Sequence, residues 1–188
     1  ALPIYGNIVG VPGYTGYLAF WVNQEIMDEV GIESIDTKED FMKYMEAVSK
    51  DGRFGYGGSW EKTYASNEIA QFVNMFGGDY FDWTKEENKE AIQFLHDLVA
   101  NKETPVDQIA DKYDQMNPKI NDGKYGCWFM WGLGTDYAKA DMLGADKIHM
   151  AMVPDFSGNG ERAIFTDSWN YVLNSASKNK DAAIKFLR

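Results

Sequence analysis

The sequence contains little cysteine, histidine and proline, and it has no long apolar run. Of its 188 residues, one is cysteine, two are histidine and five are proline. The single cysteine, Cys127, excludes an internal disulfide, and its place in an apolar segment predicts an inert core thiol. No apolar stretch approaches the roughly 20 residues that a membrane-spanning helix requires, and no secretion signal is recognisable. We therefore expect the chain as given to be soluble.

The two histidines and residues 155–160 do not have the ligand patterns of the common metal sites. His96 falls in a predicted helix and His149 in a predicted strand, and neither has Cys or His neighbours at metal-ligand spacing. Residues 155–160 begin like a calcium loop, but Thr166 stands where such a loop requires a bidentate glutamate. We interpret this segment as a turn between strands, and we expect no metal and no cofactor.

Basic residues are also in deficit, and this limits the partners. The formal net charge is -11, and the 18 Lys and Arg residues form no basic block. Such a chain repels phosphate backbones and anionic lipid, so nucleic acid and membrane surfaces are excluded as direct ligands. The composition is 45% hydrophobic and 15% aromatic, which is ordinary for one well-packed domain. A neutral or cationic ligand agrees best with this charge.

Helical and strand patterns alternate along the chain, without repeats. Apolar residues at helical spacing, bounded by caps and glycines, predict the helices, and short β-rich runs predict the strands. This alternation predicts an α/β fold in which helices flank a small mixed sheet. The predicted helices lie near residues 23–30, 37–51, 65–76, 84–101, 109–117, 135–143 and from 177, and the predicted strands near residues 8–22, 125–130, 147–153 and 163–174, with a short unassigned segment at 54–58.

Four local signals make sharper predictions about these elements. Thr37 with Asp40, and Thr84 with Glu87, have the spacing of capping boxes that begin helices. Pro118 should break or kink the helix that runs through residue 116. The turn-prone residues 12–17 interrupt the first extended segment, so we expect Tyr14 and Tyr17 to lie on a loop.

The most informative segment is residues 122–135, where an apolar run ends in a tryptophan between glycines. Residues 125–130 have the length and aromatic content of a buried strand, and Gly132 and Gly134 predict a turn before a helix. Trp131 should therefore lie at the carboxyl end of a strand, which is the edge where open α/β sheets bind ligands. The alternative is that Trp131 only caps the core.

Other catalytic and cofactor motifs are incomplete. Gly132 and Gly134 resemble the start of a dinucleotide fingerprint, but Tyr137 occupies the place of the third small residue. Residues 57–61 lack the closing glycine of a nucleophile elbow, so acyl transfer has no support. The helix that follows Gly134 can still offer backbone N–H groups to a ligand oxygen.

Aromatic residues from separate loops and strand ends form the strongest functional pattern. A tryptophan presents roughly 150 to 250 Å² of apolar surface, and the C–H face of a pyranose can cover part of it. Covering about 50 Å² is worth on the order of 1 kcal/mol, so useful affinity requires several such platforms. The aromatic candidates are Tyr14, Tyr17, Trp60, Tyr64, Trp131 and Trp169.

Acidic residues close to these aromatics leave two interpretations open. Glu61, Asp136 and Asp167 could accept hydrogen bonds from sugar hydroxyls, or two of them could act as the acid and base of a glycosidase. Sequence does not give the separation of their carboxylates. We favour the binding role, with no catalytic residue, and keep a glycoside hydrolase or lectin-like domain as the alternative.

Several short motifs follow one another in order along nearly the whole chain. They are Val11-Pro12, residues 18–23, Asp36-Thr37-Lys38-Glu39-Asp40-Phe41, Gly77-Gly78, Gly123-Lys124, Val153-Pro154 and Ser177-Lys178-Asn179-Lys180-Asp181-Ala182-Ala183. Together these motifs resemble those of family 1 extracellular solute-binding proteins, the maltose-binding-protein-like group. Ile120, Gly126-Cys127 and the missing proline near Asp36 depart from the family pattern, away from the proposed ligand contacts.

The resemblance implies a type II periplasmic-binding-protein fold and a receptor function. Such proteins have two lobes and about twice this length, so residues 1–188 would be mainly the second lobe, with hinge strands near 8–22 and 163–174. They close over a ligand by hinge motion and deliver it to the membrane permease of an ABC importer. By similarity, Trp131 would stack on sugar, the loop from Trp60 to Tyr64 would face the cleft, and Trp169 would lie beside the hinge.

The resemblance also implies an oligomeric state, a lack of enzymatic activity and a location for the protein. We expect a monomer without enzymatic activity, located outside the cytoplasm, either in the periplasm or as a lipoprotein at the cell surface. The sequence does not name the sugar or its length, and a peptide or polyamine ligand stays open.

Overall fold

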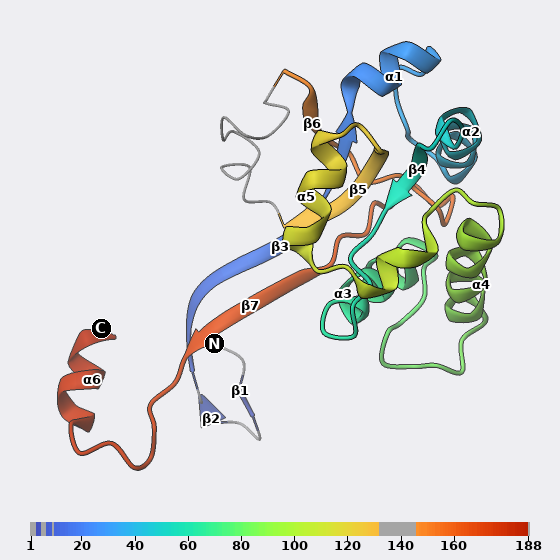
Figure 1. Cartoon of the computed structure of the whole chain (residues 1–188). Coiled ribbons are helices and arrows are strands. Elements are labelled where there is room, and N and C mark those ends of the chain that lie inside the picture. Colours follow the sequence, from blue (N-terminus) through green and yellow to red (C-terminus); the bar gives the residue numbers. More distant parts are fainter. Residues whose placement is uncertain (1–2, 5–6, 9, 132–145, 188) are drawn as a thin grey trace. The chain divides into compact units, whose positions relative to one another are not determined.

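The computed structural model describes residues 3–4, 7–8, 10–131 and 146–187 (Figure 1). They divide into two compact units, Leu18–Phe165 and Ala1–Tyr17 with Thr166–Arg188. The chain passes from one unit to the other after Tyr17 and again after Phe165. Both crossings lie within the ranges 8–22 and 163–174, and the role of these ranges as hinge strands stays a prediction.

The larger unit is built on a small mixed sheet. Its described strands follow the order β4–β5–β3–β6, with β4 (Phe54–Gly57), β5 (Tyr125–Trp131), β3 (Val11–Asn23) and β6 (Ile148–Ala151). The β4 strand runs parallel to β5, whereas β3 runs antiparallel to both β5 and β6. The apolar, aromatic composition of residues 125–130 predicted β5, whereas β4 was not assigned as a strand from the sequence.

Helices cover both faces of this sheet. Cys127 and Phe129 of β5 belong to one apolar cluster, and their neighbours Trp128 and Met130 belong to another. The first cluster takes its helical members from α1 (Gln24–Val30), α2 (Lys38–Val48), α3 (Ala65–Met75) and α4 (Glu86–Ala100), and the second from α5 (Tyr113–Asn121) (Figure 1). A strand covered on both faces is apolar at successive positions, which explains the uninterrupted apolar run of β5.

The predicted start and end of the first helix and the predicted start of the second are confirmed, whereas α2 ends at Val48, before the predicted stop at Asp51. The Asn23 side chain accepts a hydrogen bond from the Ile26 amide and begins α1, and Gly31 ends it with a left-handed φ of 71°. Thr37 and Asp40 form the expected capping box of α2. These signals work because each satisfies backbone groups that the helix end leaves unpaired.

The predicted capping box at Thr84 is wrong. The α4 helix begins at Glu86, and its N-cap residue, Lys85, makes no side-chain cap bond. The Thr84 hydroxyl instead donates to the Asp82 carboxylate over 2.6 Å. The turn before α4 is held by Asn88, whose buried amide bonds to Asp79 and Asp82 backbone groups. The Thr84 hydroxyl that the capping box requires is therefore hydrogen-bonded to Asp82 instead.

The predicted break at Pro118 is also wrong, because Pro118 lies inside α5, which continues to Asn121. A proline in a helix removes one backbone hydrogen bond and costs about 3 kcal/mol. Here the neighbouring side chains of Met116 and Ile120 are fully buried against the sheet. Their burial offsets the lost bond and holds the last turn in place. A separate 3-10 helix, η1 (Val106–Ala110), precedes α5.

The smaller unit consists mainly of extended chain. The β1 (Pro3–Ile4) and β2 (Asn7–Ile8) strands pair antiparallel, and the first part of β3 pairs antiparallel with β7 (Thr166–Tyr171) before α6 (Lys180–Phe186). Tyr14 and Tyr17 lie on β3, not on the loop that we expected. A register shift between Pro12 and Tyr14 absorbs the turn-prone residues as an irregularity of the strand.

The remaining sequence predictions about single groups hold where the structure describes them. Cys127 is buried, and burial raises the pKa of its thiol well above the usual range, as for an inert core thiol. His96 and His149 are exposed. The Asp155 carboxylate accepts from the amides of Gly158 and Gly160, which makes the 155–160 segment a turn. The predicted helix at 135–143 lies outside the described residues.

Two features are absent from the described residues. None of the helices in this part of the chain is long and apolar enough to cross a membrane. Within the same residues, His, Cys, Asp and Glu side chains do not gather in groups of three or more that could hold a metal ion.

Candidate functional site

Two tryptophans leave the sheet at the same edge of the larger unit. The parallel strands β4 and β5 are in register at Gly57 and Trp128. Trp60 follows Gly57 by three residues, and Trp131 follows Trp128 by three residues. Both therefore lie at the carboxyl edge of the parallel pair, which is where α/β sheets bind their ligands. The structure confirms the predicted position of Trp131 at the end of its strand.

A row of aromatic rings continues along this edge. The Tyr64 and Tyr113 ring centroids lie 4.6 Å apart, and Tyr113 meets Trp131 edge-on at 6.4 Å. Trp131 also meets the Phe165 ring at 6.2 Å. In the sequence, Tyr113 stands out only as one apolar position of the predicted helix. Its place as the first residue of α5, directly after a 3-10 helix, brings it between the two predicted site residues.

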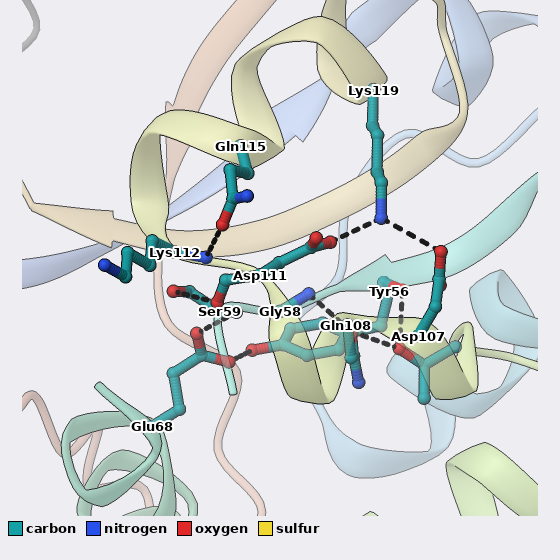
Figure 2. Close-up of polar contacts among 11 residues, drawn as sticks. Tyr56, Gly58, Ser59, Glu68, Asp107, Gln108, Asp111, Lys112, Gln115 and Lys119 are labelled. Atoms are coloured by element: carbon teal, nitrogen blue, oxygen red, sulfur yellow. Dashed lines mark hydrogen bonds and ion pairs between the residues drawn. The ribbon is translucent and has the colours of Figure 1, made fainter. Parts of the chain in front are cut away.

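The loop that carries Trp60 is fixed by a buried carboxylate. It belongs to Glu68 of α3, which is completely buried and which Figure 2 shows bonded to Ser59 and Tyr56. Its Oε1 accepts from the Ser59 amide over 2.7 Å. Its Oε2 accepts from the Trp60 indole Nε1 over 3.0 Å and from the Tyr56 hydroxyl. One carboxylate thus binds both the backbone and the side chain of the loop.

The same loop is held from the other side by η1 and the residues around it. The Gln108 side-chain oxygen accepts from the Gly58 amide over 2.7 Å, and its backbone oxygen accepts from the Trp60 amide over 3.1 Å. The Asp111 backbone oxygen accepts from the Glu61 amide and the Ser59 hydroxyl (Figure 2). Every backbone amide of residues 58–61, hereafter the 58–61 loop, therefore has a partner.

An ion pair ties this bracing segment to α5. Lys119 bonds to the Asp111 carboxylate and, over 3.3 Å, to Asp107 (Figure 2). Partial burial opposes the charge of Lys119, but the hydrogen bond and charge of Asp111 outweigh it and raise the pKa of the ammonium group. The ion pair therefore links the segment that carries Gln108 to the helix that carries Tyr113.

A glutamine fixes the third part of this edge. The buried Gln71 amide donates to the Ala163 oxygen over 2.9 Å and accepts from the Phe165 amide over 2.6 Å. These two bonds hold the segment just before the end of the larger unit and place the Phe165 ring beside Trp131. Gln71 was not among the residues predicted from sequence.

The pKa values of the two glutamates in this region, Glu68 and Glu61, are shifted in opposite directions. Desolvation raises the pKa of Glu68 to about 7, against hydrogen bonds from Tyr56, Ser59 and Trp60 that lower it. Glu61 is only partly covered, and the hydrogen bond from the Thr63 amide lowers the pKa of its carboxyl group. Glu61 is therefore ionised at neutral pH and acts as a hydrogen-bond acceptor.

The close packing around Gly58 leads to a test of this arrangement. A Cβ added at Gly58 would lie 2.6 Å from the Trp60 indole nitrogen, 2.9 Å from Glu68 Oε2 and 3.0 Å from Gln108 Oε1. We expect Gly58→Ala to lower the free energy of unfolding by about 1–3 kcal/mol, as for overpacking of a core. Urea unfolding measures the loss.

A double-mutant cycle is the control for this prediction. Trp60→Phe removes the indole nitrogen that the new methyl group meets first. The pair Gly58→Ala with Trp60→Phe should therefore lose less stability than the two single losses added together. Additive losses would contradict the proposed contact.

The predicted site residues fall into both units. Tyr14 stacks on Trp169 in the smaller unit, with ring centroids 5.9 Å apart and planes at 14°. Both side chains are 59% exposed. The smaller unit also carries Tyr17 and Asp167, while the larger carries the site residues Trp60, Glu61, Tyr64 and Trp131. Asp136 lies outside the described residues. The convergence of all nine residues on one ligand stays a prediction.

A match to a known protein family identifies the kind of protein that carries this site. Residues 2–188 match the model of the bacterial extracellular solute-binding protein family. The chain belongs to this family. Family members are binding proteins rather than enzymes.

Known relatives agree in fold and are longer. The arabinooligosaccharide-binding protein of Halalkalibacterium halodurans is 29% identical over 97% of this chain and 43% of its own length. Maltose-bound MalE3 of T. maritima has a TM-score of 0.83 at 19% identity, covering 98% of this chain and 50% of that one. The GacH receptor of Streptomyces glaucescens, solved unliganded and with acarbose, has a TM-score of 0.80 at 21% identity, covering 98% and 49%.

These similarities establish the type II periplasmic-binding-protein fold of this solute-binding protein, a small mixed sheet flanked by helices, as the sequence predicted. They also show that the chain spans about half the length of the relatives that it matches.

Proposed function

We propose that this chain forms one part of an extracytoplasmic receptor that binds a sugar or oligosaccharide for an ABC importer. The observation that carries the proposal is the row of aromatic rings at the carboxyl edge of β4 and β5, beside the braced 58–61 loop. Flat apolar faces beside an ionised acceptor are what a ring with many hydroxyls requires. The similar proteins named above bind arabinooligosaccharide, maltose or acarbose, and this supports a carbohydrate here.

The site residues divide the work by chemistry. Trp60, Tyr64 and Trp131 supply stacking surfaces, and the carboxylate of Glu61 accepts hydrogen bonds from hydroxyls. From the smaller unit, Tyr14, Tyr17 and Trp169 add aromatic surface and Asp167 adds an acceptor, with Asp136 as a further acceptor. A braced loop loses little entropy when it binds, so the bonds that hold residues 58–61 serve affinity as well as stability.

The rest of the receptor assignment follows from the length of the relatives. We infer that residues 1–188 are mainly the second lobe of a two-lobed protein, with hinge strands near 8–22 and 163–174. Closure around the ligand would then be what the membrane permease recognises. We further propose a monomer that works outside the cytoplasm, in the periplasm or on a lipid anchor, and that binds no nucleic acid.

A glycoside hydrolase or lectin-like domain is the alternative. A general acid in a glycosidase has a raised pKa, whereas hydrogen bonding lowers the pKa of Glu61. This setting favours binding without catalysis. Turnover of a chromogenic glycoside that is abolished by Glu61→Gln or Asp136→Asn would favour the enzyme and overturn the proposal.

The direct test is carbohydrate affinity in the full-length protein. A thermal-shift screen with oligosaccharides identifies the ligand, and calorimetry then gives the Kd. We expect Trp131→Ala to weaken binding about fivefold, because the loss of one stacking platform costs on the order of 1 kcal/mol.

The matched control is Trp83→Ala. Trp83 lies between α3 and α4, is 50% exposed and touches Tyr80 instead of the predicted site. Its truncation should leave the Kd unchanged. A Trp131→Ala variant that binds sugar as tightly as the wild type would remove Trp131 from the site.

A further inference from the structure

A buried carboxylate with only uncharged hydrogen-bonding partners is the unusual feature of this fold. Among the described residues, the donors to Glu68 are the Tyr56 hydroxyl, the Ser59 amide and the Trp60 indole. Tyr56 and Ser59 are completely buried, and Trp60 is partly buried. A charge in such a place is costly unless hydrogen bonds compensate it, so its protonation state and its hydrogen bonds are coupled.

Only one of these partners can receive a proton from Glu68. A backbone amide and an indole N–H are donors only, whereas a tyrosine hydroxyl both donates and accepts. A protonated Glu68 must therefore direct its O–H toward Tyr56. The Tyr56 hydroxyl lies at Oε2, the same oxygen that accepts from the Trp60 indole. The Ser59 amide, on Oε1, is not in this competition.

Protonation therefore affects the indole more than the backbone of the loop. Ionised Oε2 makes a charge-assisted bond to Trp60, about twice as strong as a neutral one. Protonated Oε2 is a neutral hydroxyl whose proton goes to Tyr56, and its bond to the indole is weakened. The Ser59 amide keeps its acceptor in both states, so the loop stays in place while the indole is released.

We propose that Glu68 is a proton-dependent positioning residue, which fixes the Trp60 indole at the ligand edge when ionised and releases it when protonated. The proposal deepens the proposed function and rests on it, because Trp60 is one of the stacking surfaces for the sugar. It predicts that the receptor binds more tightly in mildly alkaline than in mildly acidic medium.

Among the described residues, the titratable groups that interact with Glu68 are phenols. They belong to Tyr56 from β4 and Tyr113 from α5. Burial raises the pKa of both phenols above the usual range, so they stay neutral while Glu68 titrates. Burial also raises the pKa of Glu68 to about 7, which places its titration between mildly acidic and mildly alkaline medium.

The test without ligand uses ¹⁹F NMR of full-length protein containing 5-fluorotryptophan. Trp60→Phe identifies the Trp60 resonance among the six tryptophans of the chain. In the wild type this resonance should move between pH 5.5 and 8.5 with one midpoint near pH 7. In Glu68→Gln it should stay constant, at the position that the wild type reaches at low pH, because the amide imitates the protonated acid.

The matched control is Glu103→Gln. Glu103 is another buried glutamate whose pKa burial raises, but its side chain does not take part in the bonds to the 58–61 loop described above. Its substitution should leave the Trp60 titration unchanged. A Trp60 resonance that does not move in the wild type overturns the proposal, whether or not the variants fold. So does a Trp60 titration that persists in Glu68→Gln.

The ligand arm separates this inference from the proposed function. For the sugar found in the screen, the wild type should bind about 3- to 10-fold more tightly at pH 8 than at pH 5.5, as a weakened hydrogen bond predicts. Glu68→Gln should bind at both pH values as the wild type does at pH 5.5. Equal affinity of the wild type at both values overturns the positioning role. Absence of any carbohydrate binding overturns the proposed function, while the Trp60 resonance still reports on Glu68.

Discussion

Phe72→Ala is expected to lower the free energy of unfolding by about 3–5 kcal/mol, the usual cost of removing a buried phenylalanine. Phe72 is completely buried in α3. Its ring lies 5.5 Å from Tyr56 and 5.6 Å from Phe129, both at steep angles, so one substitution removes contacts to two strands of the sheet. Such edge-to-face pairs add to the area that the ring buries.

The matched control for this prediction is Phe81→Ala. Phe81 is 93% exposed on the segment between α3 and α4, so the same change of side chain removes little buried area. Its effect should stay within about 0.5 kcal/mol. Urea unfolding followed by circular dichroism measures both variants. Comparable losses for Phe72→Ala and Phe81→Ala would contradict the placement of the core.

A core substitution at Phe72 should also affect the candidate site at the carboxyl edge of β4 and β5. Gln71, its neighbour, holds the segment from Ala163 to Phe165 through two hydrogen bonds. Glu68, four residues earlier on the same helix, holds Trp60. The buried face of α3 therefore carries both the apolar core and the polar supports of the site. Stability and ligand positioning are coupled through this helix.

The sequence predicted those helix starts and ends that depend only on neighbouring residues. Asn23, Gly31 and the pair Thr37 and Asp40 bind backbone groups within four residues, so a sequence pattern is sufficient to find them. The capping box at Thr84 failed although it had the same pattern, because Asp82 offered the hydroxyl a closer acceptor. Competition between local partners is not visible in a spacing rule.

The supports of the candidate site were missed because they depend on the assembled sheet. Glu68 precedes Phe72 by one helical turn, so the buried face of α3 could have indicated it. Its partners on β4 and in the 58–61 loop become neighbours only once α3 packs on the strand. The turn-prone residues 12–17 predict a loop at Tyr14, but pairing with Trp169, far away in the sequence, makes it part of a strand. Non-local pairing decided these cases.

The second large effect is a loss of stability with rising pH that originates at Glu68. Burial raises its pKa in the folded protein from 4.5 to about 7, so between these values the folded state binds more protons than the unfolded chain. The contribution is fully present below pH 4.5 and is lost as the pH rises through 7. One pKa unit corresponds to about 1.4 kcal/mol, so the loss amounts to about 3 kcal/mol.

Glu68→Gln isolates this contribution from the other titrating groups. The neutral amide cannot ionise, so the difference in unfolding free energy between wild type and variant should change by about 3 kcal/mol between pH 4.5 and pH 8, in favour of the variant at the higher pH. Surface carboxylates such as Asp36 and Asp40, whose pKa values are lowered by hydrogen bonds from Ser34 and Thr37, contribute equally to both proteins and act at lower pH. Stability curves that run parallel over this range would show that the Glu68 carboxylate is not buried in the folded protein, and the switch at Trp60 would lose its basis.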